Sequence, residues 1–155
     1  MKVVFTSDAH GDKASLMRIY NQEQNADAFI DVGDSCLDSE EIRPFISVKG
    51  NCDYCFYPIS RILYFEGWRV FLTHGAQMSI QTMVSLAKSH GCSVLVYGHT
   101  HKVDNRIVDS VYVINPGSIS RPRDGYTGTY MVIDFSENDI IINKKEVDWW
   151  ISLTN

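Results

Sequence analysis

The sequence lacks any apolar run approaching the ~18 residues that a membrane-spanning helix needs. Its first residues offer only a short apolar stretch with a carboxylate behind it at Asp8, which does not fit a secretory signal. Positive charge is also in deficit, because 14 Lys and Arg residues stand against 19 Asp and Glu residues for a net charge of −5. That balance disfavours nucleic acid as a partner held by bulk charge. We expect a cytoplasmic protein that does not bind membranes.

Cysteines and linker residues are scarce. The four cysteines, Cys36, Cys52, Cys55 and Cys92, are too few for a disulfide-rich secreted scaffold. Cys52 and Cys55 form a CxxC pair, but no second pair completes a four-ligand zinc site, so we interpret them as reduced thiols. No repeat or Pro-, Gly- or Ser-rich linker divides the chain. We therefore expect one domain over residues 1–155.

Short apolar runs alternate with two helical patterns. Apolar residues at helical spacing predict helices over residues 14–24 and 79–90, the second closed by Gly91. β-Branched and aromatic runs predict strands over residues 2–7, 28–32, 45–48, 61–65, 68–72, 93–97, 106–114, 127–135 and 140–147. Turns are expected at Glu66-Gly67 and Asn138-Asp139. This order predicts a strand-rich α/β fold.

Nitrogen and oxygen donors gather where the predicted strands end, which is where open α/β sheets build their sites. The set comprises Asp8, His10, Asp34, Asn51, His74, His99 and His101. The remaining histidine, His90, stands at a helix end, where a surface cap is expected. Donors of this kind suit first-row divalent cations, and seven are too many for one tetrahedral ion. They are about right for two metal ions that share a carboxylate and leave positions for water.

Each of these residues alone has a simpler explanation. A single Asp or Asn after a strand is usually a turn residue, and a single His is usually a hydrogen-bonded buried side chain. The same holds for the glycines that flank the donors, which are Gly33, Gly50, Gly75 and Gly98. Glycine lets the backbone come close to a metal ion or a phosphate, so four glycines beside four donors strengthen the joint pattern.

Five blocks of the sequence occur in a recognisable order: Asp8-Ala9-His10-Gly11, Gly33-Asp34, Gly50-Asn51-Cys52-Asp53, Thr73-His74-Gly75 and Gly98-His99-Thr100-His101. Together they resemble the signature of the calcineurin-like metallophosphoesterases. The chain length and the block Asn115-Pro116-Gly117-Ser118 narrow the resemblance to the small YfcE-type phosphodiesterases of bacteria and archaea. The resemblance runs from Met1 to about Arg123 and implies a single-domain, four-layer α/β/β/α sandwich.

The resemblance also implies a dinuclear metal centre. One ion would be held by Asp8, His10, Asp34 and His101, and the other by the shared Asp34 with Asn51, His74 and His99. Manganese is the expected ion, although nickel, iron, cobalt and zinc suit such donors as well. The implied activity is phosphodiester hydrolysis by a hydroxide bound at the centre, since two metal ions roughly 3.5–4 Å apart clamp a phosphoryl group and acidify water.

Further roles follow from the same resemblance. Asn51, Asp53 and His74 are assigned to the catalytic machinery, with Asp53 orienting a ligand or lying simply in a surface loop. Asn115, Ser118 and Arg123 are expected to contact the substrate. A guanidinium of Arg121 or Arg123 could fork onto a phosphate, or both could be ordinary surface arginines.

Cys52 departs from the pattern of the wider superfamily. Many members have a histidine at this position, near the leaving group, whereas the YfcE-type branch shares the cysteine. A thiol with an unperturbed pKa near 8.5 is a poor proton donor to an alkoxide. We therefore expect a preference for acidic leaving groups, such as those of aryl phosphodiesters.

Two other functions stay open. One is a phosphomonoesterase or nucleotide-processing phosphatase of the same superfamily, and the other is a non-catalytic scaffold like a eukaryotic retromer subunit. The complete donor set favours an enzyme acting on a small phosphate ester. Phe56 and Tyr57 could stack on an aryl group or pack in the core. Trp149, Trp150 and Ile151 form an apolar end that could pack on the core or join a second copy into a homo-oligomer.

Overall fold

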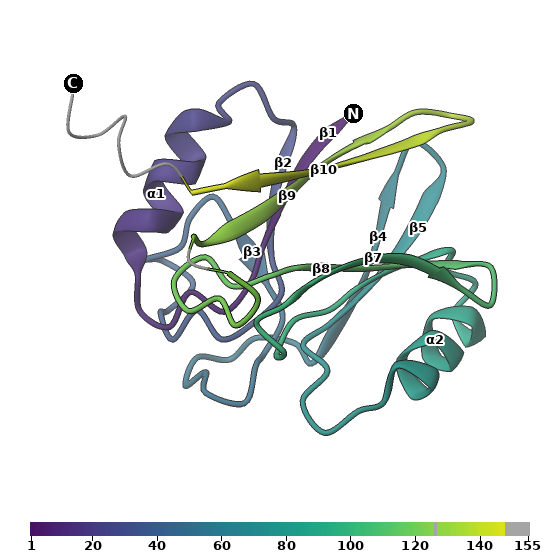
Figure 1. Cartoon of the computed structure of the whole chain (residues 1–155), viewed down its shortest axis with the longest axis horizontal. Coiled ribbons are helices and arrows are strands. Elements are labelled where there is room, and N and C mark those ends of the chain that lie inside the picture. Colours follow the sequence, from purple (N-terminus) through teal and green to yellow (C-terminus); the bar gives the residue numbers. More distant parts are fainter. Residues whose placement is uncertain (126, 148–155) are drawn as a thin grey trace.

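Two five-stranded sheets lie face to face in the computed structural model (Figure 1). The structure describes residues 1–125 and 127–147. Helix α1 (Lys13–Gln22) covers the outer face of one sheet, and α2 (Ile80–Ser89) covers the outer face of the other. The four-layer α/β/β/α sandwich that the resemblance implies is confirmed. Within the described ranges, neither helix is long and apolar enough to cross a membrane.

The first sheet has the strand order β10-β9-β1-β2-β3. Its strands are β1 (Lys2–Thr6), β2 (Ala28–Asp31), β3 (Ile46–Ser47), β9 (Thr129–Phe135) and β10 (Ile140–Glu146). β1, β2 and β3 pair in parallel, whereas β9 pairs antiparallel with both β1 and β10. The three parallel strands therefore end at one edge of this sheet.

The second sheet has the order β4-β5-β6-β8-β7. Its strands are β4 (Ser60–Phe65), β5 (Trp68–Thr73), β6 (Val94–Val96), β7 (Val103–Val108) and β8 (Val111–Pro116). β5, β6 and β8 pair in parallel, and the two edge strands pair antiparallel. A backbone hydrogen bond of 3.2 Å from Ile119 N, beyond β8, to Ser7 O, beyond β1, joins the carboxyl ends of the two sheets.

Alternation of side chains along the strands builds the three apolar layers. Residues such as Val3, Phe5, Leu72 and Val96 face the interior between the sheets and are fully buried. The intervening side chains face the helices, where the apolar side of α1 meets Val4 and that of α2 meets other residues of β5 and β6. The sheets are thus held together at their centres, and the polar loops at their carboxyl edge are free to form a site.

One predicted element was wrong. Residues 106–114 were expected to form a single strand, but the structure has the hairpin β7–β8 with Val108 opposite Val111. The turn is made by Asp109 and Ser110, whose φ angles of 50° and 66° are left-handed. Such a two-residue turn usually carries Asn-Gly or Asp-Gly, so the missing glycine hides it from sequence reasoning. The other predicted helices and strands are present with small shifts at their ends.

Candidate metal centre

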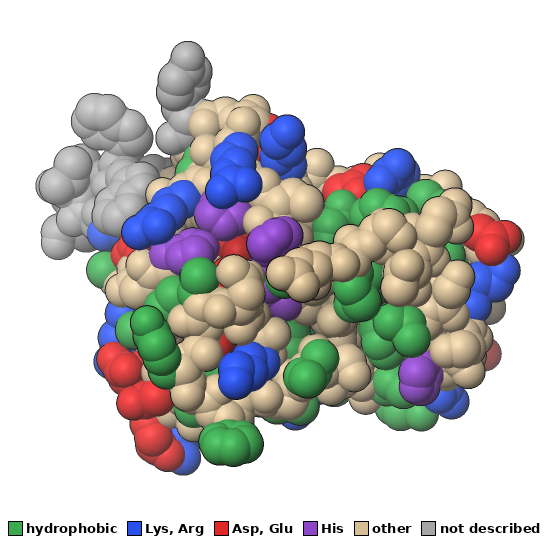
Figure 2. Space-filling view, turned by 90° about the horizontal axis from the view of Figure 1, so that it is seen from below, with side chains coloured by type: hydrophobic (Ala, Val, Ile, Leu, Met, Phe, Trp, Pro, Cys, Tyr) green, Lys and Arg blue, Asp and Glu red, His purple; other side chains and the backbone are tan. Residues whose placement is uncertain are grey.

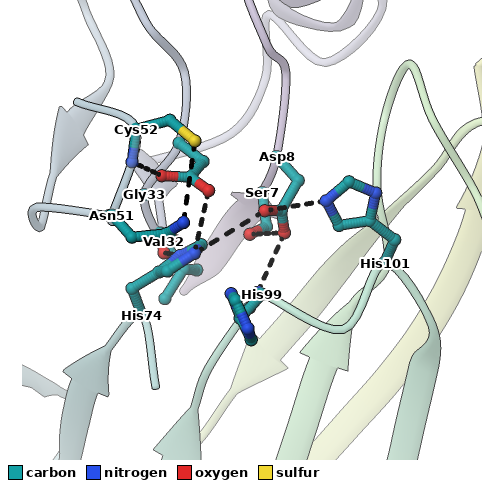
Figure 3. A network of polar contacts seen from close by, with 12 residues as sticks. Ser7, Asp8, Val32, Gly33, Asn51, Cys52, His74, His99 and His101 are labelled. Carbon is teal, nitrogen blue, oxygen red and sulfur yellow. Dashed lines mark hydrogen bonds and ion pairs between the residues drawn. The ribbon is translucent and has the colours of Figure 1, made fainter. Parts of the chain in front are cut away.

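The seven predicted donors meet at the shared carboxyl edge. Figure 3 labels five of them, which are Asp8, Asn51, His74, His99 and His101. Each lies in the loop after a strand, namely Asp8 and His10 after β1, Asp34 after β2, Asn51 after β3, His74 after β5, and His99 and His101 after β6. The loops are linked by backbone hydrogen bonds from Asp8 N to Gly33 O (3.0 Å) and from Gly98 N to His74 O (3.1 Å). The parallel strands of both sheets therefore supply the site.

Asp8, His10 and His101 form a first cluster. Their ligand atoms all lie within 4.8 Å of one another. His101 Nε2 is 3.3 Å from Asp8 Oδ1 and 3.2 Å from His10 Nε2. One carboxylate oxygen and two imidazole nitrogens thus face one small volume, which is the arrangement that a divalent cation binds.

Asp34, His74 and His99 form a second cluster, again with ligand atoms within 4.8 Å of one another. His74 Nε2 is 3.2 Å from Asp34 Oδ2, and the same carboxylate oxygen is 4.0 Å from His10 Nε2 of the first cluster. Asp34 therefore lies between the two clusters, where a carboxylate can be shared by two ions.

Two buried atoms show that this arrangement fits a cation. Among the described residues, neither Asp8 Oδ1 nor His74 Nε2 has a well-aligned hydrogen bond, although both are buried. They lie 3.8 Å apart in the centre of the cluster. Buried polar atoms without partners cost free energy, and a bound metal ion would satisfy both of them.

The second ring nitrogens hold two of the imidazoles in place. His74 Nδ1 lies 2.8 Å from the carbonyl oxygen of Val32, and His101 Nδ1 lies 2.8 Å from that of Arg121. When a ring that donates its Nδ1–H to a carbonyl is neutral, its Nε2 is unprotonated, which is the form that binds a metal ion. The backbone thus aims both histidines at the centre.

The charge state of these rings differs in the metal-free protein. Burial lowers the pKa of His74, but the carboxylates of Asp34 and Asp8 outweigh it and raise the pKa to about 8. For His10, burial dominates over the same two carboxylates and the pKa falls below its ordinary value. A cation entering at neutral pH would therefore displace a proton from His74, whereas His10 is already neutral.

Backbone strain is concentrated at the donors. Five of the seven have left-handed φ angles, which are Asp8 (54°), His10 (47°), Asp34 (59°), His99 (72°) and His101 (61°). This conformation costs an L-residue roughly 1–2 kcal/mol, so the surrounding fold must impose it.

Two glycines allow the close packing around the carboxylates. A Cβ at Gly50 would lie 2.0 Å from Asp34 Oδ1, and a Cβ at Gly98 would lie 2.1 Å from Ser7 Oγ. Neither position has room for a side chain while the donors stay where they are. The close approach expected of these glycines is present, and it is made to the donor side chains and their supports.

Asp53 acts on the backbone of the site. Its Oδ2 accepts hydrogen bonds from Asp34 N (2.9 Å) and Gly50 N (2.7 Å), and its Oδ1 accepts one from Cys36 N (3.0 Å). It is buried, so the surface-loop alternative does not hold. Asp53 orients the loop that carries Asp34, but through peptide groups and not through an imidazole.

Asn115 and Ser118 lie behind the donor loops. Both are fully buried. Asn115 Nδ2 donates to Gly98 O (3.0 Å) and Thr100 Oγ1 (3.1 Å), and Ser118 Oγ donates to Asp8 O (2.7 Å). These contacts give both residues a positioning role, and their burial leaves no surface for the substrate contact that the resemblance suggested.

Sequence reasoning missed Asp31. This carboxyl group is fully buried at the end of β2, where it accepts hydrogen bonds from Thr6 Oγ1 (3.0 Å), Ser47 Oγ (2.8 Å) and Gly33 N (3.1 Å). Burial raises its pKa to about 7 against the effect of these donors. Asp31 ties the ends of β1, β2 and β3 together. An acidic residue inside an apolar strand next to a candidate ligand was the signal that could have revealed it.

A cavity of about 430 Å³ opens above the two clusters. Its walls are formed by His10, Asp34, Asn51, Cys52, His99, His101, Arg121, Pro122 and Arg123. Figure 2 shows histidines grouped on this face with basic side chains beside them. The floor thus offers metal ligands, and Arg121 and Arg123 add positive charge at the wall.

The aromatic and apolar residues named from the sequence are not among the metal donors. Tyr57 is buried and its hydroxyl donates to Leu37 O at 2.8 Å, so it belongs to the core, whereas Phe56 is fully exposed. Trp149, Trp150 and Ile151 lie outside the described residues.

A sandwich of this kind with such a donor set is the architecture of a metallophosphoesterase, and comparison with known proteins agrees. Residues 1–138 match the family model of the calcineurin-like phosphoesterase superfamily domain. The chain belongs to this superfamily. It is 34% identical to the probable metallophosphoesterase YsnB of Bacillus subtilis, over 90% of this chain and 86% of the relative. It is 28% identical to phosphodiesterase YfcE of Escherichia coli, over 91% and 90% of the two chains.

Solved structures share the fold. A predicted phosphoesterase from Streptococcus pneumoniae superimposes with a TM-score of 0.85 and 26% identity, covering 95% of this chain and 90% of that one. Vps29 of Entamoeba histolytica, solved as a complex with Zn²⁺, superimposes with a TM-score of 0.71 and 16% identity, covering 96% and 100%. The expected family is confirmed, and the family implies divalent metal ions.

Proposed function

We propose that the protein is a metal-dependent phosphodiesterase that works with two divalent ions at this centre. The observation that carries the proposal is the convergence of two donor clusters that adjoin at Asp34, where the buried Asp8 Oδ1 has no well-aligned hydrogen bond among the described residues. The YfcE-like relatives, one of which is named a phosphodiesterase, support the same reaction class.

The chain's own side chains bind the phosphate group, supply positive charge and hold the ligand loops in place. Bound divalent ions would supply Lewis acidity and an acidified water, the two contributions that metal ions make to phosphoester hydrolysis. Arg121 and Arg123 line the cavity and can form paired hydrogen bonds to the non-bridging oxygens of a phosphate. Asp53 and Asn115 hold the ligand loops so that no rearrangement is needed on binding.

Cys52 favours substrates whose leaving group needs no proton. It stands in the cavity wall, and burial together with Asp34 and Asp53 raises its pKa, so the thiol is a weak acid. We expect aryl phosphodiesters to be cleaved much faster than alkyl ones. In a Cys52→His variant the alkyl-to-aryl rate ratio should rise about tenfold or more, since an imidazolium can protonate an alkoxide. An unchanged ratio would refute this role for position 52.

The direct test starts from purified protein with its metal content measured and then reconstituted with single divalent ions. Aryl phosphodiesters and phosphomonoesters are assayed with each ion, which separates the diesterase from the phosphomonoesterase alternative. Asp34→Asn should lower the rate by more than about 100-fold, because the shared carboxylate is weakened. His90→Ala, which removes an exposed histidine away from the centre, should retain most of the activity. If the Asp34→Asn variant keeps both its bound metal and its activity, the proposal is contradicted.

A scaffold is the second candidate, because Vps29 proteins share the fold. A scaffold needs no ester hydrolysis, so stoichiometric metal binding with no activity on any phosphate ester would favour it. For the proposed enzyme, a small phosphate ester is the partner, and the cytoplasm is the compartment in which Cys36 and Cys52 stay reduced.

A further inference from the structure

Cys52 is placed against the metal centre by its own backbone. Its N–H donates to Asp34 Oδ1 at 2.8 Å, and its Sγ lies 3.6 Å from Asn51 Nδ2 (Figure 3). The side chain is exposed and forms part of the cavity wall. Its sulfur is therefore accessible from the same space that the donors face.

The sulfur belongs to a third group of potential ligand atoms. A ring nitrogen of His10, a carboxylate oxygen of Asp34 and Cys52 Sγ all lie within 4.8 Å of one another. Metal bonds of about 2.0–2.3 Å let one ion bind atoms up to about 4.6 Å apart, so a group within 4.8 Å needs at most a small approach of its atoms to share an ion. The buried Asp8 Oδ1, which has no well-aligned hydrogen bond among residues 1–125 and 127–147, lies 3.8 Å from His10 Nε2 and indicates independently that a cation belongs beside this histidine.

Cys36 provides a contrast within the same chain. Its Sγ lies 3.8 Å from His10 Nδ1, whereas His10 Nε2 is the atom 3.2 Å from His101 Nε2 in the cluster. Cys36 thus sits on the side of the imidazole that faces away from the other donors. Both cysteines are close to His10, but only Cys52 belongs to a group of potential metal ligands.

We propose that Cys52 is an additional ligand of the centre, binding through its thiolate the ion that His10 and Asp34 also hold. The proposal rests on the proposed metal centre. When the metal–sulfur bond forms, the thiol proton is released to solvent, so the bound Cys52 has no proton to give to a leaving group and the expected preference for acidic leaving groups is kept. Thiolate selects thiophilic ions, whereas nitrogen and oxygen donors alone do not discriminate among them. The centre should therefore prefer zinc, iron(II) or cobalt to manganese, the ion that the family resemblance implies.

Cobalt(II) added to the metal-free protein reports the ligands directly. Visible d–d bands show that the ion is bound, and a near-ultraviolet sulfur-to-cobalt charge-transfer band shows that a thiolate is among its ligands. We expect both in the native protein. Cys52→Ser should lose the charge-transfer band and keep the d–d bands, and Cys36→Ser should keep both. Circular dichroism of each variant verifies the fold, which an exposed Cys-to-Ser change should not disturb.

Metal selectivity is a second readout. The ratio of zinc to manganese affinity should fall about tenfold or more in Cys52→Ser and stay unchanged in Cys36→Ser. Bound cobalt without a charge-transfer band in the native protein would overturn the role of Cys52 and leave the metal centre standing. A band that survives Cys52→Ser and disappears in Cys36→Ser would also overturn it. Failure to bind any divalent ion would overturn the proposed function and this inference together.

Discussion

Asp34 is held from three sides. Its Oδ1 accepts the Cys52 N–H at 2.8 Å, its Oδ2 lies 3.2 Å from His74 Nε2, and its peptide N–H donates to Asp53 Oδ2 at 2.9 Å. Burial raises its pKa, but His74 and the Cys52 N–H outweigh that effect and lower it, so the side chain is ionised at neutral pH. A carboxylate fixed in this way is already oriented for metal binding in the metal-free protein.

The packing around Asp34 leads to a prediction at Gly50. Gly50→Ala would place a methyl group 2.0 Å from the present position of Asp34 Oδ1, so the carboxylate must move. We expect at least a tenfold loss of metal affinity and about 1–3 kcal/mol of lost stability from overpacking. Metal content of the purified variant and its thermal unfolding without metal measure the two effects.

Gly125 supplies the matched control. Nothing lies within 4 Å of a Cβ built there, so Gly125→Ala should bind metal like the native protein. Native metal affinity in Gly50→Ala would mean that the carboxylate of Asp34 is not a ligand.

Asp53 allows a test of a residue that acts only through peptide groups. Asp53→Asn replaces one of the two acceptor oxygens by an NH₂ group, which faces a backbone N–H. We expect a loss of about 1.5–3 kcal/mol, the usual value for a hydrogen bond to a charged group, and a 10–100-fold loss of metal affinity. Calorimetric titration with metal and chemical unfolding give both numbers. Asp38→Asn, at an exposed position of the loop that carries Asp34, should change neither much.

Residues of the site differ in how far sequence could predict them. The seven donors follow the ends of five strands, and parallel strands bring their ends together, so spacing and strand order suffice to group the donors. Asp31 and Ser7 could not be found this way. Ser7 donates to Asp8 Oδ2 at 2.6 Å, a contact between neighbours that depends on the left-handed backbone at Asp8. Supporting contacts of this kind depend on atomic geometry, which no spacing rule contains.

Among the elements, the β7–β8 hairpin shows why a strand was misread. Val108 and Val111 are both apolar and pair with each other across the turn. In the sequence, the apolar residues on either side of Asp109 and Ser110 therefore look like one continuous strand. The two helices were predictable because their buried faces follow the helical period, with Leu16 and Ile19 in α1. Turns without glycine are the elements that sequence patterns reveal least.

The same hairpin yields a stability prediction. Ser110 has a φ of 66°, a conformation that costs an L-residue roughly 1–2 kcal/mol and glycine nothing. Ser110→Gly should raise the free energy of unfolding by about 0.5 kcal/mol after glycine's own entropy cost of roughly 0.5–1 kcal/mol. Ser110→Ala keeps the strained φ and should bring no gain. Denaturant unfolding of the three proteins measures the difference, and equal gains in both variants would contradict the explanation.

For the whole molecule, buried titratable groups make the metal-free protein sensitive to pH. His74 has a folded-state pKa of about 8 against an ordinary 6.5. Its protonated form stabilises the fold fully below pH 6.5, and this stability is lost as the pH rises through 8. Asp31, at about 7 against 3.8, acts in the same direction, because its stabilising neutral form is lost as the pH rises toward 7. The metal-free protein should therefore lose about 1.3 kcal/mol from His74 between pH 6.5 and 8, out of about 2 kcal/mol over the whole titration.

Metal binding should reverse this dependence, because the ion takes the place of the proton on His74. At pH 7 binding should release close to one proton from this ring, and the release should vanish well above pH 8. Titration calorimetry in buffers of different ionisation enthalpy counts the protons. A metal concentration of 100 times Kd adds about 2.7 kcal/mol to stability, which exceeds the roughly 2 kcal/mol that the protonated His74 contributes.

Asp31→Asn separates the two groups. Removing this carboxyl should flatten the stability of the metal-free protein between about pH 4 and 7 and leave the proton released on metal binding unchanged, because Asp31 contacts Thr6, Ser47 and Gly33 and none of the donors. If metal binding releases no proton at pH 7 in either protein, the metal ion does not displace the proton of His74. The charged pair of His74 and Asp34 would then stabilise the fold without binding a metal ion.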